Sequence, residues 1–221
     1  MTNNISKFLS ILGGSIIAVL ATLEVAFAND ISVSHDLKDF DQIRLDNVGI
    51  QLEVEVGEDF AIEVSGDEEL VETLLLKVRG DKLVIYRDDN HKVWDGRGND
   101  SPLVTASMPS FTGFELRGAV DASIKGVDSD EVEFDLKGAG NIEVEGRCRW
   151  LIVDLKGAGN VEADDLICEE VDVTLKGAGN IEVHASKRVD ADIDGLGNID
   201  VYGSPEEVKK DDGWLSHISI H

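Results

Sequence analysis

The sequence predicts an all-β fold: a parallel β-solenoid, or β-helix, of about 19–20 residues per coil with an N-terminal β extension. A seven-residue phrase recurs at 135–141, 154–160 and 174–180, and weaker copies lie at 115–121 and 192–198. The first glycines fall at positions 118, 138, 157, 177 and 195, in steps of 20, 19, 20 and 18 residues. A repeat with this period is typical of a solenoid.

Apolar and charged residues alternate within each unit. Val132, Phe134 and Leu136 alternate with carboxylates before the glycines, and Ile142 and Val144 do so after them. A period of two predicts strands with one buried face. Twenty residues leave no room for the helix of a βαβ crossover, so the units must stack as coils.

Equivalent positions of stacked coils form columns along the solenoid. The predicted inward columns are Leu116, Leu136, Leu155, Leu175, Ile193 and Ala122, Ile142, Val161, Ile181, Ile199. The glycines are expected to provide turn conformations with positive φ. Side-chain amides stacked at Asn141, Asn160, Asn180 and Asn198 predict a structural turn ladder. A basic column (Arg117, Lys137, Lys156, Lys176) beside an acidic one (Glu115, Asp135, Asp154, Asp192) predicts a surface lattice of ion pairs.

Three stretches carry a family resemblance: the repeated Leu-Lys-Gly-Ala-Gly-Asn phrase, Met108-Pro109-Ser110-Phe111 and Val201-Tyr202-Gly203-Ser204-Pro205. Over residues 40–205 the chain resembles the head GIN domain family of putative auto-transporter adhesins. The resemblance implies a secreted or periplasmic β-solenoid. It carries over no activity and no catalytic residue, because none is established for the family.

Residues 1–28 have the pattern of a secretory signal peptide, with Lys7, an apolar run over 8–23 and Ala26-Phe27-Ala28 before a cleavage point. An uncleaved membrane anchor is the alternative. We therefore expect a periplasmic or secreted protein of a bacterial cell envelope, without a transmembrane span once the signal is removed. The net charge of -25 argues against nucleic acid as a partner.

Three regions follow the signal peptide. Residues 29–110 are predicted to form the N-terminal β part, with a short helix over 67–74 capped by Asp67 and turns at 57–59 and 80–82. Residues 111–203 are the repeat solenoid, and 204–221 a capping segment that includes Trp214. The polar segment 87–101 is either a plain surface loop or a sugar-binding loop with candidates His91, Trp94, Asp95 and Arg97.

The two cysteines, Cys148 and Cys168, occupy equivalent positions in adjacent coils. Neighbouring rungs bring α-carbons within disulfide range, and an exported compartment favours oxidation. Two buried thiols are the alternative.

The sequence favours an exported, non-enzymatic binding or scaffolding protein, adhesin-like, whose partner is an envelope protein or a glycan. We expect no cofactor, no metal site and no catalytic residue, and the oligomeric state is open. One alternative is a polysaccharide-active enzyme using Asp135 and Asp154 with Lys137 and Lys156. Another is calcium-dependent binding by the carboxylate column Glu143, Glu162, Glu182 and Asp200.

Overall fold

The computed structural model describes residues 30–87, 101–213 and 216–221, which form one 13-stranded sheet and one short helix. The elements are β1 (Asp30–Ser34), β2 (Gln42–Val56), β3 (Ala61–Asp67), α1 (Glu68–Val71), β4 (Leu74–Arg79), β5 (Lys82–Arg87), β6 (Leu103–Met108), β7 (Gly113–Leu136), β8 (Ala139–Leu155), β9 (Ala158–Leu175), β10 (Ala178–Ile193), β11 (Leu196–Tyr202), β12 (Glu207–Asp212) and β13 (Ser216–Ile220).

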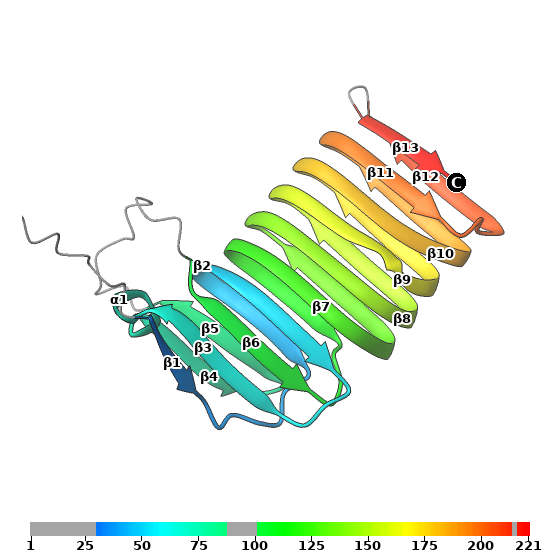
Figure 1. The fold of residues 1–221 in the computed structure, drawn as a ribbon. Coiled ribbons are helices and arrows are strands. Elements are labelled where there is room, and N and C mark those ends of the chain that lie inside the picture. The colour runs from blue at the N-terminus through cyan, green and yellow to red at the C-terminus, as the bar shows by residue number, and fades with distance from the viewer. Residues whose placement is uncertain (1–29, 88–100, 214–215) are drawn as a thin grey trace, which may run out of the picture.

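Strands β7 to β11 form the predicted parallel β-solenoid, stacked coil upon coil (Figure 1). The register pairs Leu136 with Leu155, Leu155 with Leu175 and Leu175 with Ile193. Each inward aliphatic side chain therefore lies over its counterpart in the next coil. The predicted fold class is confirmed.

The coil stack begins before the repeats. β2 pairs in parallel with β7, with Leu45 opposite Leu116 and Leu52 opposite Ala122, so it already forms a coil. On the other side of β2, β5 pairs with its first half and β6 with its second half. β2 therefore lies between β7 on one side and β5 and β6 on the other. After β2 the chain leaves the stack, forms the end of the solenoid, and then returns to the other side of β2 as β7 (Figure 1).

Antiparallel strands close this end of the stack. β4 forms a hairpin with β5 through the turn predicted at 80–82, and β3 and β1 extend the sheet from β6. β6 lies between β2 and β3, so the turn after β2 does not join paired strands. Helix α1 is shorter than the predicted 67–74, but Asp67 caps it as expected by accepting a hydrogen bond from the Glu69 N–H at 3.0 Å.

At the other end of the stack, β12 pairs in parallel with β10, and β13 pairs in parallel with β11. Ile218 of β13 lies over Ile199 and is buried, so this strand covers the last coil. Trp214, the predicted capping residue, lies outside the described residues.

The interior is a continuous dry core of aliphatic residues with a few phenylalanines, and no described residue buried in it is polar or charged. The described residues include no helix of the length and apolar character needed to cross a membrane.

The repeated glycines share a close approach to the preceding coil, since a β-carbon on Gly140 or Gly157 would lie 1.8 Å from a carbonyl oxygen there, but the two positions differ in φ. The second glycine has the expected positive φ, as at Gly140 (153°) and Gly159 (146°). The first glycine of each repeat does not have a positive φ. It is required because of the close approach alone: a β-carbon on Gly157 would lie 1.8 Å from the carbonyl oxygen of Gly138 in the preceding coil. The expectation of positive φ was therefore wrong for the first glycine, where close backbone approach excludes a side chain.

Replacing Gly157 with alanine should destabilise the protein by at least about 3 kcal/mol, because the two backbones must separate at the corner. The free energy of unfolding in urea measures this. Gly49→Ala is the matched control, since a β-carbon on this corner glycine of β2 would meet nothing within 4 Å. Equal stability of the two variants would contradict the contact argument.

Candidate functional site

The four predicted ladder asparagines lie in one column at the coil corners. Asn160 donates to Asn141 at 3.1 Å, Asn180 to Asn160 at 3.0 Å and Asn198 to Asn180 at 3.0 Å. Asn141 donates in turn to Asp121 at 3.0 Å. Because the side chains use their amides on one another, this column is suited to holding the coils in register.

The structure joins Cys148 and Cys168 in a disulfide. The two residues are direct partners in the parallel register of β8 and β9, with α-carbons 4.6 Å apart. The bond therefore links adjacent coils.

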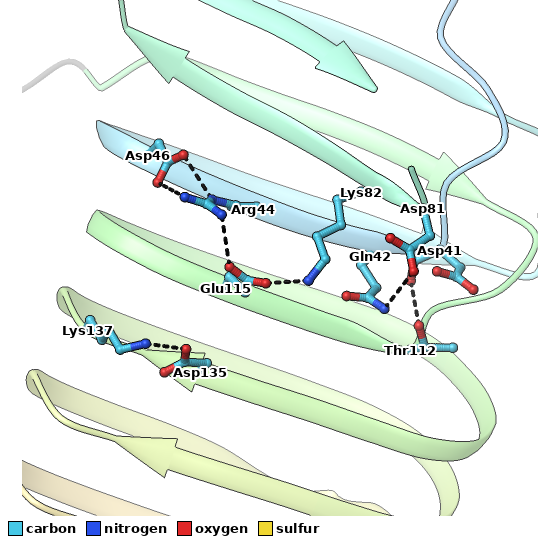
Figure 2. Close-up of polar contacts among 10 residues, drawn as sticks. All are labelled: Asp41, Gln42, Arg44, Asp46, Asp81, Lys82, Thr112, Glu115, Asp135 and Lys137. Atoms are coloured by element: carbon cyan, nitrogen blue, oxygen red, sulfur yellow. Dashed lines mark hydrogen bonds and ion pairs between the residues drawn. The ribbon is translucent and has the colours of Figure 1, made fainter. Parts of the chain in front are cut away.

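The carboxylates considered for an enzyme are each held by the lysine two residues later, just past the end of the strand. Lys137 contacts Asp135 at 2.5 Å, and Lys156 pairs with Asp154 in the same way in the next coil (Figure 2 shows the first pair). The hydrogen bond to Asp154 raises the pKa of Lys156 above its ordinary value. Two successive coils thus carry the same ion pair, an arrangement typical of a repeated surface lattice.

The carboxylate column considered for calcium runs along the other broad side of the coils. Glu143, Glu162, Glu182 and Asp200 are successive partners in the register. Burial, followed by the charges of neighbouring Asp164, Asp200 and Glu162, raises the pKa of Glu182 above its ordinary value. In the part of the chain that the structure describes, no group of three or more histidine, cysteine or acidic residues is placed to hold a metal ion.

The loop candidates His91, Trp94, Asp95 and Arg97 lie in 88–100, outside the described residues. The described chain resumes at Ser101, and β6 follows the loop as a strand.

A basic pocket lies on the outer side of β4, β5 and β2. It has a volume of about 480 Å³ and is lined by five cationic side chains together with Asp46, Asn47, Val84 and Tyr86. The cations are Arg44, Lys77, Arg79, Lys82 and Arg87. We refer to these five residues as the basic pocket.

Strand pairing explains how these cations meet. In the register, Arg79 of β4 is opposite Lys82 of β5, and Lys77 is opposite Val84, which pairs on its other side with Arg44 of β2. Three neighbouring strands thus point cations to one side. The aliphatic stems bury Val84, which is only 6% exposed although it lies on the outer face.

The cations differ in how far they are neutralised. Arg44 donates two hydrogen bonds to Asp46, at 2.9 and 3.0 Å, and lies 3.5 Å from Glu115, which also pairs with Lys82 (Figure 2). Asp46 raises the pKa of Arg44 through this hydrogen bond. Lys77 lies 3.6 Å from the centre of the Tyr86 ring. Neither Lys77 nor Arg79 makes an ion pair with another described residue.

Sequence reasoning missed this pocket. The signal was present as Lys77, Arg79, Lys82 and Arg87 flanking a Gly-Asp turn, with cations at alternate positions. The overall charge of -25 concealed it, and the partner Arg44 lies far away in the sequence.

Glu182→Gln should stabilise the protein at pH 7 by roughly 0.2–1 kcal/mol, because it removes a like charge between stacked carboxylates. The folded-state pKa of Glu182 is raised, so its unfavourable contribution is fully present above that pKa and disappears as the pH falls to the unfolded-state value. Urea unfolding from about pH 4 to 8 should show a weaker pH dependence in the variant. Glu58→Gln, in an exposed turn, is the control. An equal change in stability and in its pH dependence for both variants would contradict the argument that stacked carboxylates repel one another at Glu182.

Comparisons with known proteins agree with the architecture. The chain is similar in structure to a protein titled a putative adhesin from Bacteroides fragilis, with a TM-score of 0.71, 23% identity, and coverage of 87% of this chain and 97% of that one. A putative adhesin from Parabacteroides merdae has a TM-score of 0.49 and 17% identity, with coverage of 87% and 96%. At 23% identity, the likeness to the Bacteroides fragilis protein supports a shared fold alone. Among curated proteins, none matches this sequence.

The family comparison covers most of the chain. The family model described as "Putative auto-transporter adhesin, head GIN domain" matches residues 39–205. This range includes the basic pocket and every coil from β2 to β11. The chain therefore belongs to the head GIN domain family.

Proposed function

We propose that this protein is an exported, non-enzymatic binding protein of the bacterial cell envelope, and that the basic pocket is its binding surface. The family description, which names adhesins, supports a binding role. The partner is then an envelope component that carries negative charge.

The observation that carries this proposal is the clustering of five cations in a chain with 45 acidic and 20 basic residues. Arg79 and Lys82 are direct partners of antiparallel strands, where like charges are destabilising. Carboxylates are abundant in this chain, so the same five cations would be better neutralised at many other positions of the fold. An anionic ligand would offset the repulsion.

The repeated surface supports a non-enzymatic role. The pairs of Asp135 with Lys137 and of Asp154 with Lys156 are equivalent from coil to coil, whereas a catalytic site needs one carboxyl to differ from its neighbours. Incubation with a panel of glycans should therefore give no turnover. Turnover that Asp135→Asn or Asp154→Asn abolishes would contradict this part of the proposal.

The binding role predicts that purified protein cosediments with envelope fragments through the basic pocket. Lys77→Glu combined with Arg79→Glu should weaken this binding at least about tenfold, because attraction becomes repulsion. Cosedimentation over a range of fragment concentrations measures the change. Higher salt should weaken the binding of the unaltered protein.

Arg149→Glu combined with Lys187→Glu is the control for this experiment. It changes the net charge equally, at exposed residues that pair with Asp130 and Glu169. The urea midpoints of both double variants show whether the fold is retained. Equal loss of binding in both would overturn the assignment of the pocket.

Export has its own test. Expression of the full chain in a bacterium should yield a periplasmic or secreted protein that begins at Asn29 and contains no free thiol. A chain lacking residues 1–28 should stay in the cytoplasm with both cysteines reactive. Mass spectrometry and thiol labelling measure these outcomes; a membrane-bound product that retains residues 1–28 would overturn cleavage and favour the anchor.

A further inference from the structure

We propose that the ligand of the basic pocket is a linear acidic polysaccharide that lies along the solenoid axis. The binding path continues from the pocket over the basic column, which consists of Arg117, Lys137, Lys156 and Lys176. This inference rests on the proposed binding role and names the class of its ligand.

The pocket and the column are continuous because their strands are neighbours. Arg117 of β7 pairs with Asp46 of β2, whose side chain holds Arg44 of the pocket. The next members follow coil by coil: the Lys137 N–H donates to the Leu116 carbonyl at 2.9 Å and the Lys156 N–H to that of Leu136 at 2.8 Å. Figure 2 shows Arg44, Lys82 and Lys137 on the same side of the sheet, with the rung that carries Glu115 between Arg44 and Lys137.

One cation lies on each successive rung, and four of the seven already contact a carboxylate. The order is Lys77 on β4, Lys82 on β5, Arg44 on β2, then Arg117, Lys137, Lys156 and Lys176. Rungs of a sheet are about 4.8 Å apart. An extended polymer of uronic acids has one carboxylate per sugar, and a sugar unit in such a chain is close to this length. The rung spacing matches the ligand along the basic column, whereas Lys82, Arg44 and Arg117 are each offset by two residues from one rung to the next.

Nearby carboxylates neutralise part of the positive charge of this path. Asp46 and Glu115 contact pocket cations, and Asp135 and Asp154 pair with column lysines. The lysines are the more accessible partners: the Lys137 side chain is 42% exposed against 25% for Asp135. A polyanion approaching from solvent meets the ammonium groups first.

The path has a defined end. Lys176 lies beside Thr174 instead of an aspartate and makes no ion pair with another described residue. In the next coil, Asp194 takes the place of the cation, and Asp190 and Asp192 line the outer side of β10. Binding should therefore gain from ligand length only up to about seven units, one for each rung that carries a cation.

The chemistry of the pocket favours a sugar acid over single-stranded nucleic acid. Single strands are bound by stacking bases on aromatic rings. Tyr86 is the aromatic residue that lines the pocket, and Lys77 already covers a face of its ring. Arginine and lysine bind carboxylates without such a platform.

Titration calorimetry with galacturonate oligomers of two, four and eight units tests the proposal. The eight-unit oligomer should bind at least about tenfold more tightly than the two-unit oligomer, because it contacts more cations. The fully methyl-esterified eight-unit oligomer, which is neutral, should not bind. Lys77→Glu with Arg79→Glu should weaken binding of all three acids.

A second variant separates the column from the pocket. Lys156→Glu with Lys176→Glu should weaken the eight-unit oligomer at least about fivefold and leave the two-unit oligomer unchanged, since only the longer ligand reaches that far. Arg149→Glu with Lys187→Glu should behave as the unaltered protein. Affinity independent of ligand length, or equal loss in the control, would overturn the proposed path.

The outcome also separates this inference from the binding role on which it rests. If envelope fragments bind through Lys77 and Arg79 but galacturonate oligomers neither bind nor compete, the binding role stands and the acidic polysaccharide is wrong. Tighter binding of single-stranded RNA, or of vesicles of phosphatidylglycerol, would likewise overturn the choice of ligand class. Absence of binding to fragments and oligomers alike would overturn both.

Discussion

The close contact of one glycine corner with the next governs this structure. Gly138, Gly157 and Gly177 lie so near one another's backbones that a β-carbon on either of the later two would fall about 2 Å from a carbonyl oxygen below it. Such a contact tolerates little sliding of one coil over another. It fixes the register, and the register then places each leucine over a leucine and each asparagine over an asparagine.

The same register that favours the core creates an electrostatic problem on the surface. A column of identical leucines packs well, whereas a column of identical charges repels itself. The protein deals with this in different ways: asparagines exchange hydrogen bonds along their column, and lysines pair with the aspartates two residues before them. The carboxylates around Glu182 lack such a partner column, and burial together with the neighbouring negative charges raises the pKa of Glu182.

Much of the solenoid could be predicted from the sequence because its information is local and repeated. One phrase was sufficient to predict the coils and the inward columns. The cysteine positions predicted that Cys148 and Cys168 lie in adjacent rungs, with a disulfide and two buried thiols both left open. The N-terminal end could not be predicted in the same way, since β5 and β6 stack on β2 although the chain forms them later. No repeat marks that return, so the meeting of Arg44 with Lys77 and Lys82 was not visible. The carboxylates elsewhere in the chain dominated the average charge and concealed the pocket.

Edge protection is a second explanation for cations near the end of a sheet, because lysine on an edge strand discourages pairing with other chains. It accounts for Lys77 and Arg79 on β4, which pairs only with β5 among the described strands. It does not account for Lys82 and Arg44, which lie one and two strands further in. The opposite end of the stack provides the comparison: there Lys209 pairs with Asp190 at 2.8 Å, and Lys210 donates to the Ile218 carbonyl at 3.1 Å. Both edges carry cations, and at the β12 end Arg188 of β10 also lies one strand further in, where it pairs with Asp172 and Asp190. At the β4 end Lys77 and Arg79 make no ion pair with another described residue, and an anionic ligand would account for that difference where edge protection does not.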